Sequence, residues 1–322
     1  MTFDRIIGHA RQKEFLRRTL SHNKLAHAYL FEGPQGVGKR LTALALAGAV
    51  FCLEGTGCGE CVPCRKIDHN NHPDILSVEP DGNNIKIEQI RSLQKTLSFK
   101  PVEASRRICL IDQADKMNLA AANSLLKTLE EPTAETLIIL ISARPEALLS
   151  TVLSRCQRLP FARLPQSCIE STLIEQRGFD QKEAHIIAAL ADGSFQMALD
   201  RDPAFYLERR IEILKRVTAL SPGSIVPLME LAKELASDKE TIPDTLELLQ
   251  AFYRDLLLYS HNRPVESLIN IDLVEKIRRI AAQENTTSIL NKLSAVNECQ
   301  WNHERNVNPQ LNMEVLLLRL AA

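Results

Sequence analysis

Four of the eight cysteines fall within one short stretch of the chain. Their spacing is C-x5-C-x2-C-x2-C, and the four residues are Cys52, Cys58, Cys61 and Cys64. Tight C-x2-C turns let thiolates converge on one tetrahedral ion, and four sulfur ligands leave no open coordination position. We therefore expect one structural zinc ion per chain. His69 and His72 are alternative ligands should Cys52 face away.

A second stretch has the spacing of a phosphate-binding loop. Gly33-Pro-Gln-Gly-Val-Gly-Lys39 follows an apolar run and precedes an Ala/Leu-rich one, which is the strand–loop–helix context that such a loop requires. Its glycines, Gly33, Gly36 and Gly38, let backbone N–H groups curl around phosphate, and Lys39 would reach the outer phosphates. A plain glycine-rich turn would leave Lys39 and this context unexplained.

Two positions depart from what nucleotide hydrolysis needs. The residue after Lys39 should be Ser or Thr, whose hydroxyl ligates Mg²⁺, but Arg40 stands there, and Thr42 lies on another side of the predicted helix. The apolar run Ile108-Cys-Leu-Ile-Asp112 suits the strand that ends in the acidic metal-site residue, but Gln113 follows where an active enzyme has Glu. A neutral amide cannot act as a general base. We expect no ATPase activity, and the sequence leaves open whether ATP or ADP binds without hydrolysis.

The elements that must position these residues alternate between strand-like and helix-like stretches. Apolar runs predict strands over 28–32, 75–78, 108–111 and 137–141. Helices are predicted over 39–52, 88–97 and 119–131, the last with Asn118 as N-cap and Pro132 as its stop. This alternation predicts a parallel sheet with helices on both faces. After about residue 160 only helical patterns remain, with breaks at Gly178 and Gly193.

Composition narrows the classes of function. The 39 basic and 40 acidic residues give a formal net charge of -1, whereas a protein that clamps nucleic acid by itself usually carries a basic surplus. Any DNA contact is therefore expected through an assembly. No secretory signal opens the sequence, and the longest apolar run, 41–53, is too short to span a bilayer. We expect a cytoplasmic protein with no membrane contact.

Several motifs together resemble the AAA+ subunits of bacterial replication clamp loaders. They are the phosphate loop, the four-cysteine insert, Ile111–Asn118, Ala122–Pro132 and Ser154-Arg155-Cys156. The resemblance is strong over about residues 3–162, moderate in the segment that follows, and weaker in the tail, where Asn306–Leu311 carries it. In that family the gamma/tau subunits hydrolyse ATP and the delta-prime subunits are degenerate at the catalytic positions. Arg40 and Gln113 make the resemblance one to the delta-prime branch.

The resemblance implies roles for further residues. Arg155 would be an arginine finger that reaches the nucleotide of an adjacent gamma subunit, and the alternative is an ordinary surface arginine. Gln196 occupies the slot where active relatives place a phosphate-contacting Arg. Ser142 would contact phosphate or merely cap a strand, and the sequence does not separate the two. Lys127, Glu130 and Glu131 are candidates for facing a neighbouring subunit.

The implied architecture has three parts. They are a AAA+ core over 1–162 with the cysteine insert at 52–64, a helical lid over 163–204, and an all-helical collar domain over 205–322. The implied function is that of a stator in a hetero-pentamer with gamma/tau and delta, which helps ATP-driven loading of the sliding clamp onto primed DNA.

Two alternatives differ in class. An active gamma-like ATPase would have Ser or Thr after Lys39 and Glu after Asp112. A stand-alone phosphate-loop transferase would have an acid–base constellation for its acceptor, and we find none in the sequence.

Overall fold

The computed structural model describes residues 2–132, 135–200, 202–221, 223 and 225–322. The chain divides into two compact units, Met1–Cys168 with Gly193–Met197, and Ile169–Asp192 with Ala198–Ala322. The predicted three-part division, with boundaries at residues 162 and 204, stays a prediction.

The first unit is built on a parallel sheet in the order β2-β3-β4-β1-β5. The strands are β1 (Ala28–Glu32), β2 (Ile75–Val78), β3 (Arg107–Ile111), β4 (Thr136–Ser142) and β5 (Gln157–Pro160). The first four confirm the strands predicted from apolar runs. We did not predict β5, because among the described residues this edge strand pairs with β1 alone, and Leu159 is its one buried residue.

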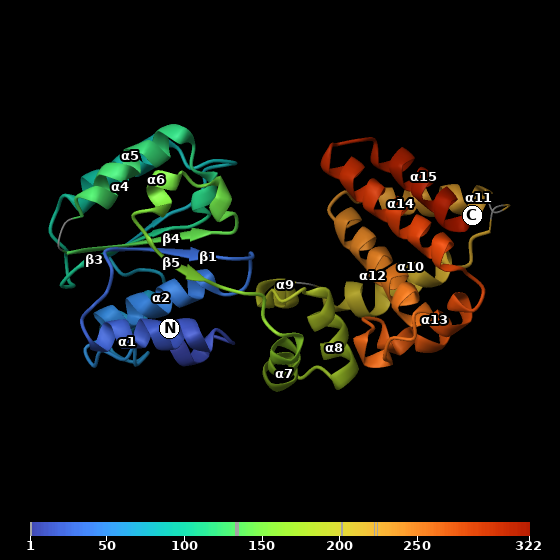
Figure 1. The fold of residues 1–322 in the computed structure, drawn as a ribbon, viewed down its shortest axis with the longest axis horizontal. Helices are drawn as coiled ribbons and strands as arrows, with labels where there is room; N and C mark the ends of the chain where they lie inside the picture. The colour runs from blue at the N-terminus through green and yellow to red at the C-terminus, as the bar shows by residue number, and fades with distance from the viewer. Residues whose placement is uncertain (1, 133–134, 201, 222, 224) are drawn as a thin grey trace. The chain divides into compact units, whose positions relative to one another are not determined.

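Helices cover both faces of the sheet (Figure 1). On one face lie α1 (Ala10–Ser21) and α2 (Lys39–Phe51), with α3 (Val62–Asp68) against α2. On the other lie α4 (Ile87–Leu97), α5 (Leu119–Glu130) and α6 (Ser150–Leu153). Asn118 caps α5 as predicted, since its Oδ1 accepts a hydrogen bond from the Ala121 N–H at 2.8 Å. Alternate residues of β1 point into the two separate cores, as a strand requires.

From α7 onward, the part of the chain that the structure describes contains helices and turns and no strand. The helices are α7 (Gln166–Arg177), α8 (Gln181–Leu190), α9 (Phe195–Asp200), α10 (Arg210–Val217), α11 (Ile225–Ala236), α12 (Ile242–Ser260), α13 (Val274–Ala281), α14 (Thr286–Glu304) and α15 (Pro309–Ala321). One continuous apolar core joins α10 to α15. This confirms the predicted fold class, a parallel α/β core followed by helices.

A buried polar cluster helps to fix the packing of the helical unit. The Arg210 side chain is 1% exposed and donates to the Tyr206 carbonyl at 2.9 Å and to Asp272 Oδ2 at 2.6 Å. Asp255 is fully buried and accepts from the N–H groups of Ile269 and Asn270. No described helix is both long enough and apolar enough to cross a bilayer.

Candidate phosphate site and cysteine cluster

The phosphate loop lies at the carboxyl edge of the sheet. Parallel strands end at the same edge, and this gathers the loop after β1, Glu79 after β2, Asp112 after β3 and Ser142 at the end of β4. Residues 33–38 join β1 to α2, and Lys39 is the first residue of that helix. The three glycines adopt φ angles of 141° at Gly33, 75° at Gly36 and 104° at Gly38, which residues with a side chain rarely adopt.

Carbonyl groups of the loop are hydrogen-bonded within the chain. Five of them accept hydrogen bonds at 2.5 to 3.2 Å: those of Gly33 and Pro34 from Lys39 Nζ, Gly36 from the Gln196 N–H, Val37 from His9 Nε2, and Gly38 from Thr42 Oγ1. Among the described residues, none accepts a hydrogen bond from the N–H groups of residues 36–40. This polarity, with carbonyls bonded and N–H groups free at a helix N-terminus, suits an anion.

Lys39 itself is buried within the loop, with 6% of its surface exposed. Burial lowers its pKa from the ordinary lysine value, and the carboxylates of Asp112 and Asp115 oppose that change. Its ammonium now bonds to loop carbonyls, so it would have to release them to reach a phosphate.

Arg40 forms hydrogen bonds with two acidic side chains at this edge. Its Nη1 donates to Asp112 Oδ2 at 3.1 Å and also to Glu79 Oε1. Although burial opposes the change, these two hydrogen bonds raise the pKa of Arg40 above its ordinary value. The other oxygen of Asp112 accepts from the Gln113 N–H at 2.8 Å. A Mg²⁺ ion does not fit this arrangement, because the hydroxyl ligand is missing and both oxygens of Asp112 are already bonded.

Ser142 and the segment around Gln196 complete the surroundings of the loop. Ser142 is fully buried, donates its hydroxyl proton to Asp115 Oδ1 at 2.9 Å, and accepts at its carbonyl from the Gly33 N–H. Ser194 packs directly on the loop, since a Cβ atom at Gly36 would lie 2.0 Å from Ser194 Oγ. The predicted residues of the phosphate site therefore lie together in one unit.

Arg155 follows α6 and is held within its own chain. Its Nη2 pairs with Glu130 Oε1 at 2.7 Å, and its Nη1 donates to the Thr151 carbonyl at 2.9 Å. The side chain is still 35% exposed. Exposed pairs of this kind are worth only about 0–1 kcal/mol, so this contact would exchange readily for a better anion.

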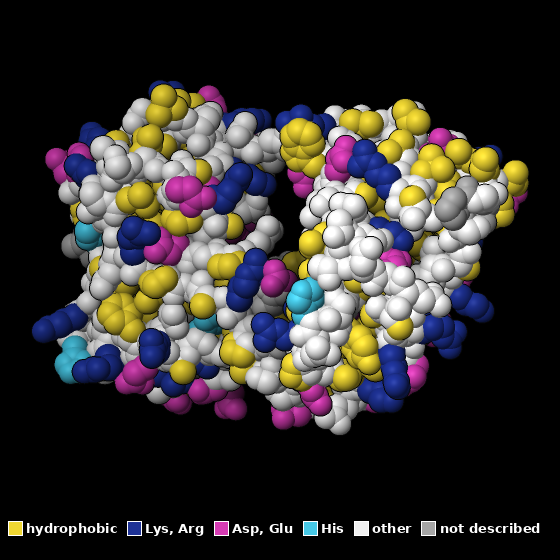
Figure 2. Space-filling model, turned by 45° about the vertical axis from the view of Figure 1, so that its right-hand side comes forward, with side chains coloured by type: hydrophobic (Ala, Val, Ile, Leu, Met, Phe, Trp, Pro, Cys, Tyr) yellow, Lys and Arg dark blue, Asp and Glu magenta, His cyan; other side chains and the backbone are white. Residues whose placement is uncertain are grey.

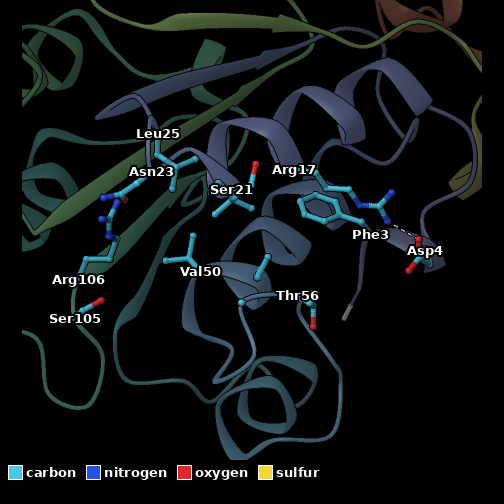
Figure 3. A pocket seen from close by; sticks show the side chains of 13 residues that line it. Phe3, Asp4, Arg17, Ser21, Asn23, Leu25, Val50, Thr56, Ser105 and Arg106 are labelled. Carbon is cyan, nitrogen blue, oxygen red and sulfur yellow. Dashed lines mark hydrogen bonds and ion pairs between the residues drawn. The ribbon is translucent and has the colours of Figure 1, made fainter.

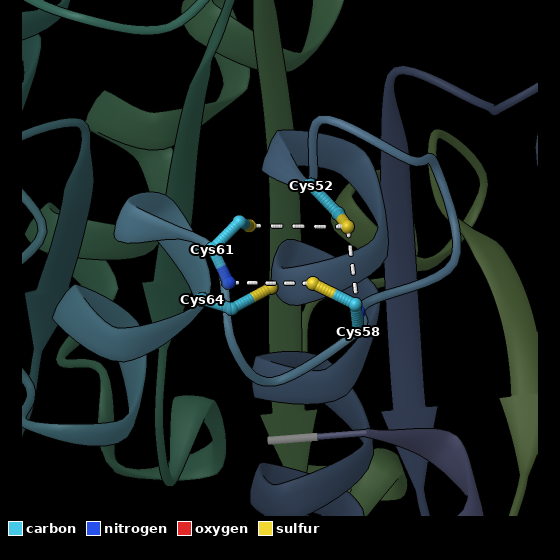
Figure 4. A group of neighbouring side chains, drawn as sticks. All are labelled: Cys52, Cys58, Cys61 and Cys64. Carbon is cyan, nitrogen blue, oxygen red and sulfur yellow. Dashed lines mark hydrogen bonds between the residues drawn. The ribbon is translucent and has the colours of Figure 1, made fainter.

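The four cysteines converge as predicted (Figure 4). Their sulfur atoms lie within 4.8 Å of one another. Cys52 follows α2, Cys61 precedes α3 and Cys64 lies within it. The N–H groups of Glu54 and Cys58 donate to Cys52 Sγ at 3.4 and 3.3 Å, and such donors stabilise a thiolate ligand. The arrangement can hold a tetrahedral metal ion.

The charge states of these thiols are set by their surroundings. Burial raises the pKa of Cys52, but backbone N–H groups outweigh it and lower the value to about 5. Burial and the neighbouring sulfurs raise the pKa of Cys64 to about 12. His72 is not one of the converging groups: it stacks on Phe51 at 4.4 Å and accepts from the Asp74 N–H.

A groove of about 710 Å³ opens elsewhere on the same unit (Figure 3). Leu25 and Val50 contribute apolar lining, and the guanidinium groups of Arg17 and Arg106 lie toward opposite ends. Arg17 also pairs with Asp4 at 2.5 Å. No motif in the sequence predicts this groove, because four separate segments of the chain line it.

Two family models match the chain. The model for "DNA polymerase III, delta subunit" matches residues 8–165, and the model for "DNA polymerase III, delta subunit, C terminal" matches residues 206–322. The DNA polymerase III delta-prime subunit of Bacillus subtilis (strain 168) is 37% identical over 319 residues, which cover 96% of this chain and 95% of that protein. The chain belongs to the DNA polymerase III delta-prime family.

Two further relatives agree with this placement. The delta-prime subunit of Pseudomonas aeruginosa is 29% identical over 92% of each chain. The tau subunit of Bacillus subtilis is 26% identical over 99% of this chain and 61% of its own length. The family predicted from the motifs, clamp-loader AAA+ subunits of the delta-prime type, is thus confirmed. The roles predicted for individual residues of this delta-prime family member stay predictions.

Proposed function

We propose that this chain is the non-hydrolysing stator subunit of a bacterial replication clamp loader. The observation that carries the proposal is the contact of Arg40 with Asp112, in a site where Gln113 stands in place of a general base. The loop keeps the backbone geometry that holds phosphate, while the groups that hold Mg²⁺ and activate water are replaced. Gly33, Gly36, Gly38 and Lys39 would hold ATP or ADP without turnover.

The partners in this proposal are gamma/tau and delta subunits in a hetero-pentamer in the cytoplasm, with the sliding clamp and primed DNA contacted through the assembly. The similarity to tau supports a common assembly. Charges of both signs are mixed over the face drawn in Figure 2, with no single-sign surface for DNA on that face.

The helical unit offers an apolar surface for such an assembly. Leu311, Val315 and Leu318 are each at least 42% exposed, and their spacing of four and three residues places them on one face of α15. Trp301 on α14 is 53% exposed. Figure 2 shows hydrophobic side chains gathered on this unit. We assign this surface to contacts between collar domains.

The cysteine cluster would hold one structural zinc ion, with Cys52, Cys58, Cys61 and Cys64 as its ligands. Four thiolates around zinc leave no position for a substrate, so the ion would stabilise the fold and take no part in chemistry. The backbone N–H donors at Cys52 support thiolate ligation.

Arg155 would act as an arginine finger toward the nucleotide of a neighbouring gamma subunit. Its guanidinium is charged at all relevant pH values, and a planar fork pairs well with phosphate oxygens. In the free chain it pairs with Glu130, which would be exchanged for phosphate in the assembly. An arginine supplied in trans is typically worth about 10³ or more in rate.

The test is a loader reconstituted from this chain with gamma/tau and delta. Arg155→Ala should leave assembly by gel filtration intact and lower the DNA- and clamp-stimulated ATPase only in part, because other active sites keep their own fingers. Arg155→Lys should rescue little. Arg17→Ala is the matched control, since Arg17 is also half-exposed and also pairs with one carboxylate.

Two results would contradict the proposal. If the chain failed to join gamma/tau and delta, it would not be a loader subunit. If Arg155→Ala loaders hydrolysed ATP and loaded clamps at the wild-type rate, Arg155 would be an ordinary surface arginine, and the chain a purely structural subunit.

A further inference from the structure

A guanidinium occupies the acidic end of the phosphate site. Arg40 is the second residue of α2, and its Nη1 bonds to Asp112 at the end of β3 and to Glu79 at the end of β2. In active phosphate-loop enzymes the carboxylate at the position of Asp112 helps to hold Mg²⁺. A cation that belongs to the protein therefore already fills the place of the metal.

Charges around the loop balance without an added ion. Lys39, Arg40 and Arg144 supply three positive charges, and Asp112, Glu79 and Asp115 supply three negative ones. A divalent ion would have to displace Arg40 from Asp112 or lie beside it, and two cations at such a separation repel each other. The second oxygen of Asp112 is bonded to the Gln113 N–H, so it is not free to compensate.

Arg40 retains donors for a ligand. A guanidinium has five N–H groups. Both bonds described above leave from Nη1, and among the described residues no acceptor bonds to Nε or Nη2. The N–H groups of residues 36–40 are free in the same sense. The loop N–H groups can donate to the oxygens of a phosphate or diphosphate, and so can the free Nε and Nη2 of Arg40, the second residue of the helix that follows the loop.

We infer that Arg40 replaces the divalent cation in this site, so that the loop binds a nucleoside diphosphate without metal. The inference deepens the proposed function and rests on the phosphate site described there. A stator that holds nucleotide in this way would do so independently of the Mg²⁺ that its hydrolysing neighbours need. Arg40 is thus the residue that sets the metal requirement of the site.

The experiment is titration calorimetry of the full chain with ADP, in EDTA and in Mg²⁺. Wild-type protein should bind ADP in EDTA, and Mg²⁺ should change the Kd by less than about twofold. Arg40→Ser restores the missing hydroxyl and frees Asp112 and Glu79. It should weaken binding in EDTA by about tenfold and make Mg²⁺ tighten it by a similar factor. Arg40→Lys, which keeps the charge, should retain binding in EDTA.

The control is Arg209→Ser in the other unit. Arg209 also bonds to two carboxylates, Glu212 at 3.0 Å and Glu234 at 2.7 Å, so this variant loses the same kind of ion pair away from the loop. Its ADP binding should equal that of wild type. Circular dichroism melts establish that each variant is folded before titration.

Three results would overturn the inference: no ADP binding by the wild type in EDTA, wild-type binding that Mg²⁺ tightens about tenfold, or an Arg40→Ser profile identical to wild type. Gel filtration with gamma/tau and delta distinguishes failure of this inference from failure of the proposed function. A chain that assembles but binds no ADP would keep its stator role and lose only the inference about Arg40.

Discussion

The two ends of α2 carry two candidate binding sites that differ in how many of the required side chains are present. At its C-terminal end the four cysteines converge with their sulfur atoms within 4.8 Å, and every ligand that a zinc site needs is present. At its N-terminal end the glycines keep the φ angles of a phosphate loop, while Arg40 and Gln113 stand where hydrolysis needs a hydroxyl and a carboxylate. Backbone geometry and chemical competence are thus separable, because different residues encode them.

The largest effect should come from the cysteine end. Cys58→Ser removes one thiolate, and purified protein should fall from about one zinc ion per chain to nearly none, with a loss of several kcal/mol in the free energy of unfolding. Metal analysis and thermal melts measure both quantities. Cys168→Ser is the control and should keep the metal. If wild-type protein contained no zinc, the four cysteines would not form a metal site, and the contrast between the two ends of α2 would be wrong.

At the phosphate end, the stability of the fold should depend on the backbone conformation of the loop glycines. An alanine Cβ at position 33 would lie 2.0 Å from the Phe161 carbonyl oxygen, at a φ of 141°. Gly33→Ala should therefore cost about 3 kcal/mol of unfolding free energy. Gly82→Ala should cost about 1 kcal/mol, because φ is 68° there and, beyond the chain neighbours, no described residue lies within 4 Å of the added Cβ. Chemical denaturation measures both free energies. If the two variants lost equal unfolding free energy, close packing against Phe161 would not be what requires glycine at position 33.

A smaller effect should appear in the pH dependence of stability. Burial lowers the pKa of His9, whose ring bonds to the Val37 carbonyl of the loop. The unfolded chain therefore takes up this proton first, and stability falls as the pH drops below about 6.5. His9→Gln should flatten the slope of unfolding free energy between about pH 7 and pH 5.5, by less than about 1 kcal/mol in total. His22→Gln, at the exposed end of α1, should leave it unchanged.

The smallest effect should be on turnover, where we expect none. The isolated chain should hydrolyse ATP no faster than background, and Lys39→Ala should not change that rate, because the Mg²⁺ hydroxyl and the general base are already missing. A phosphate-release assay measures this. If the isolated chain hydrolysed ATP and Lys39→Ala abolished that activity, the phosphate site at the N-terminal end of α2 would be a working hydrolytic site, contrary to the comparison.

The sequence predicted well whatever depends on neighbouring residues. The capped helix after Asn118 and the cysteine spacing are local patterns, and the structure has both. The sequence predicted poorly the features that depend on contacts between residues far apart in the chain. Strand β5 was missed because an edge strand needs no apolar run, and no local signal places Arg40 against Asp112, 72 residues further along the chain. That contact arises because the parallel strands β1 and β3 end at the same edge of the sheet, where α2 begins and Asp112 lies.

The contact of Arg40 with two carboxylates also bears on how hydrolysis could be restored to the site. Arg40→Ser alone would leave Asp112 and Glu79 without the cation that both now bond, and turnover would still lack its general base at Gln113. Residues in one hydrogen-bonded network are energetically coupled, so the effects of substitutions here do not add independently. Hydrolysis would therefore require at least two substitutions made together, one at Arg40 and one at Gln113.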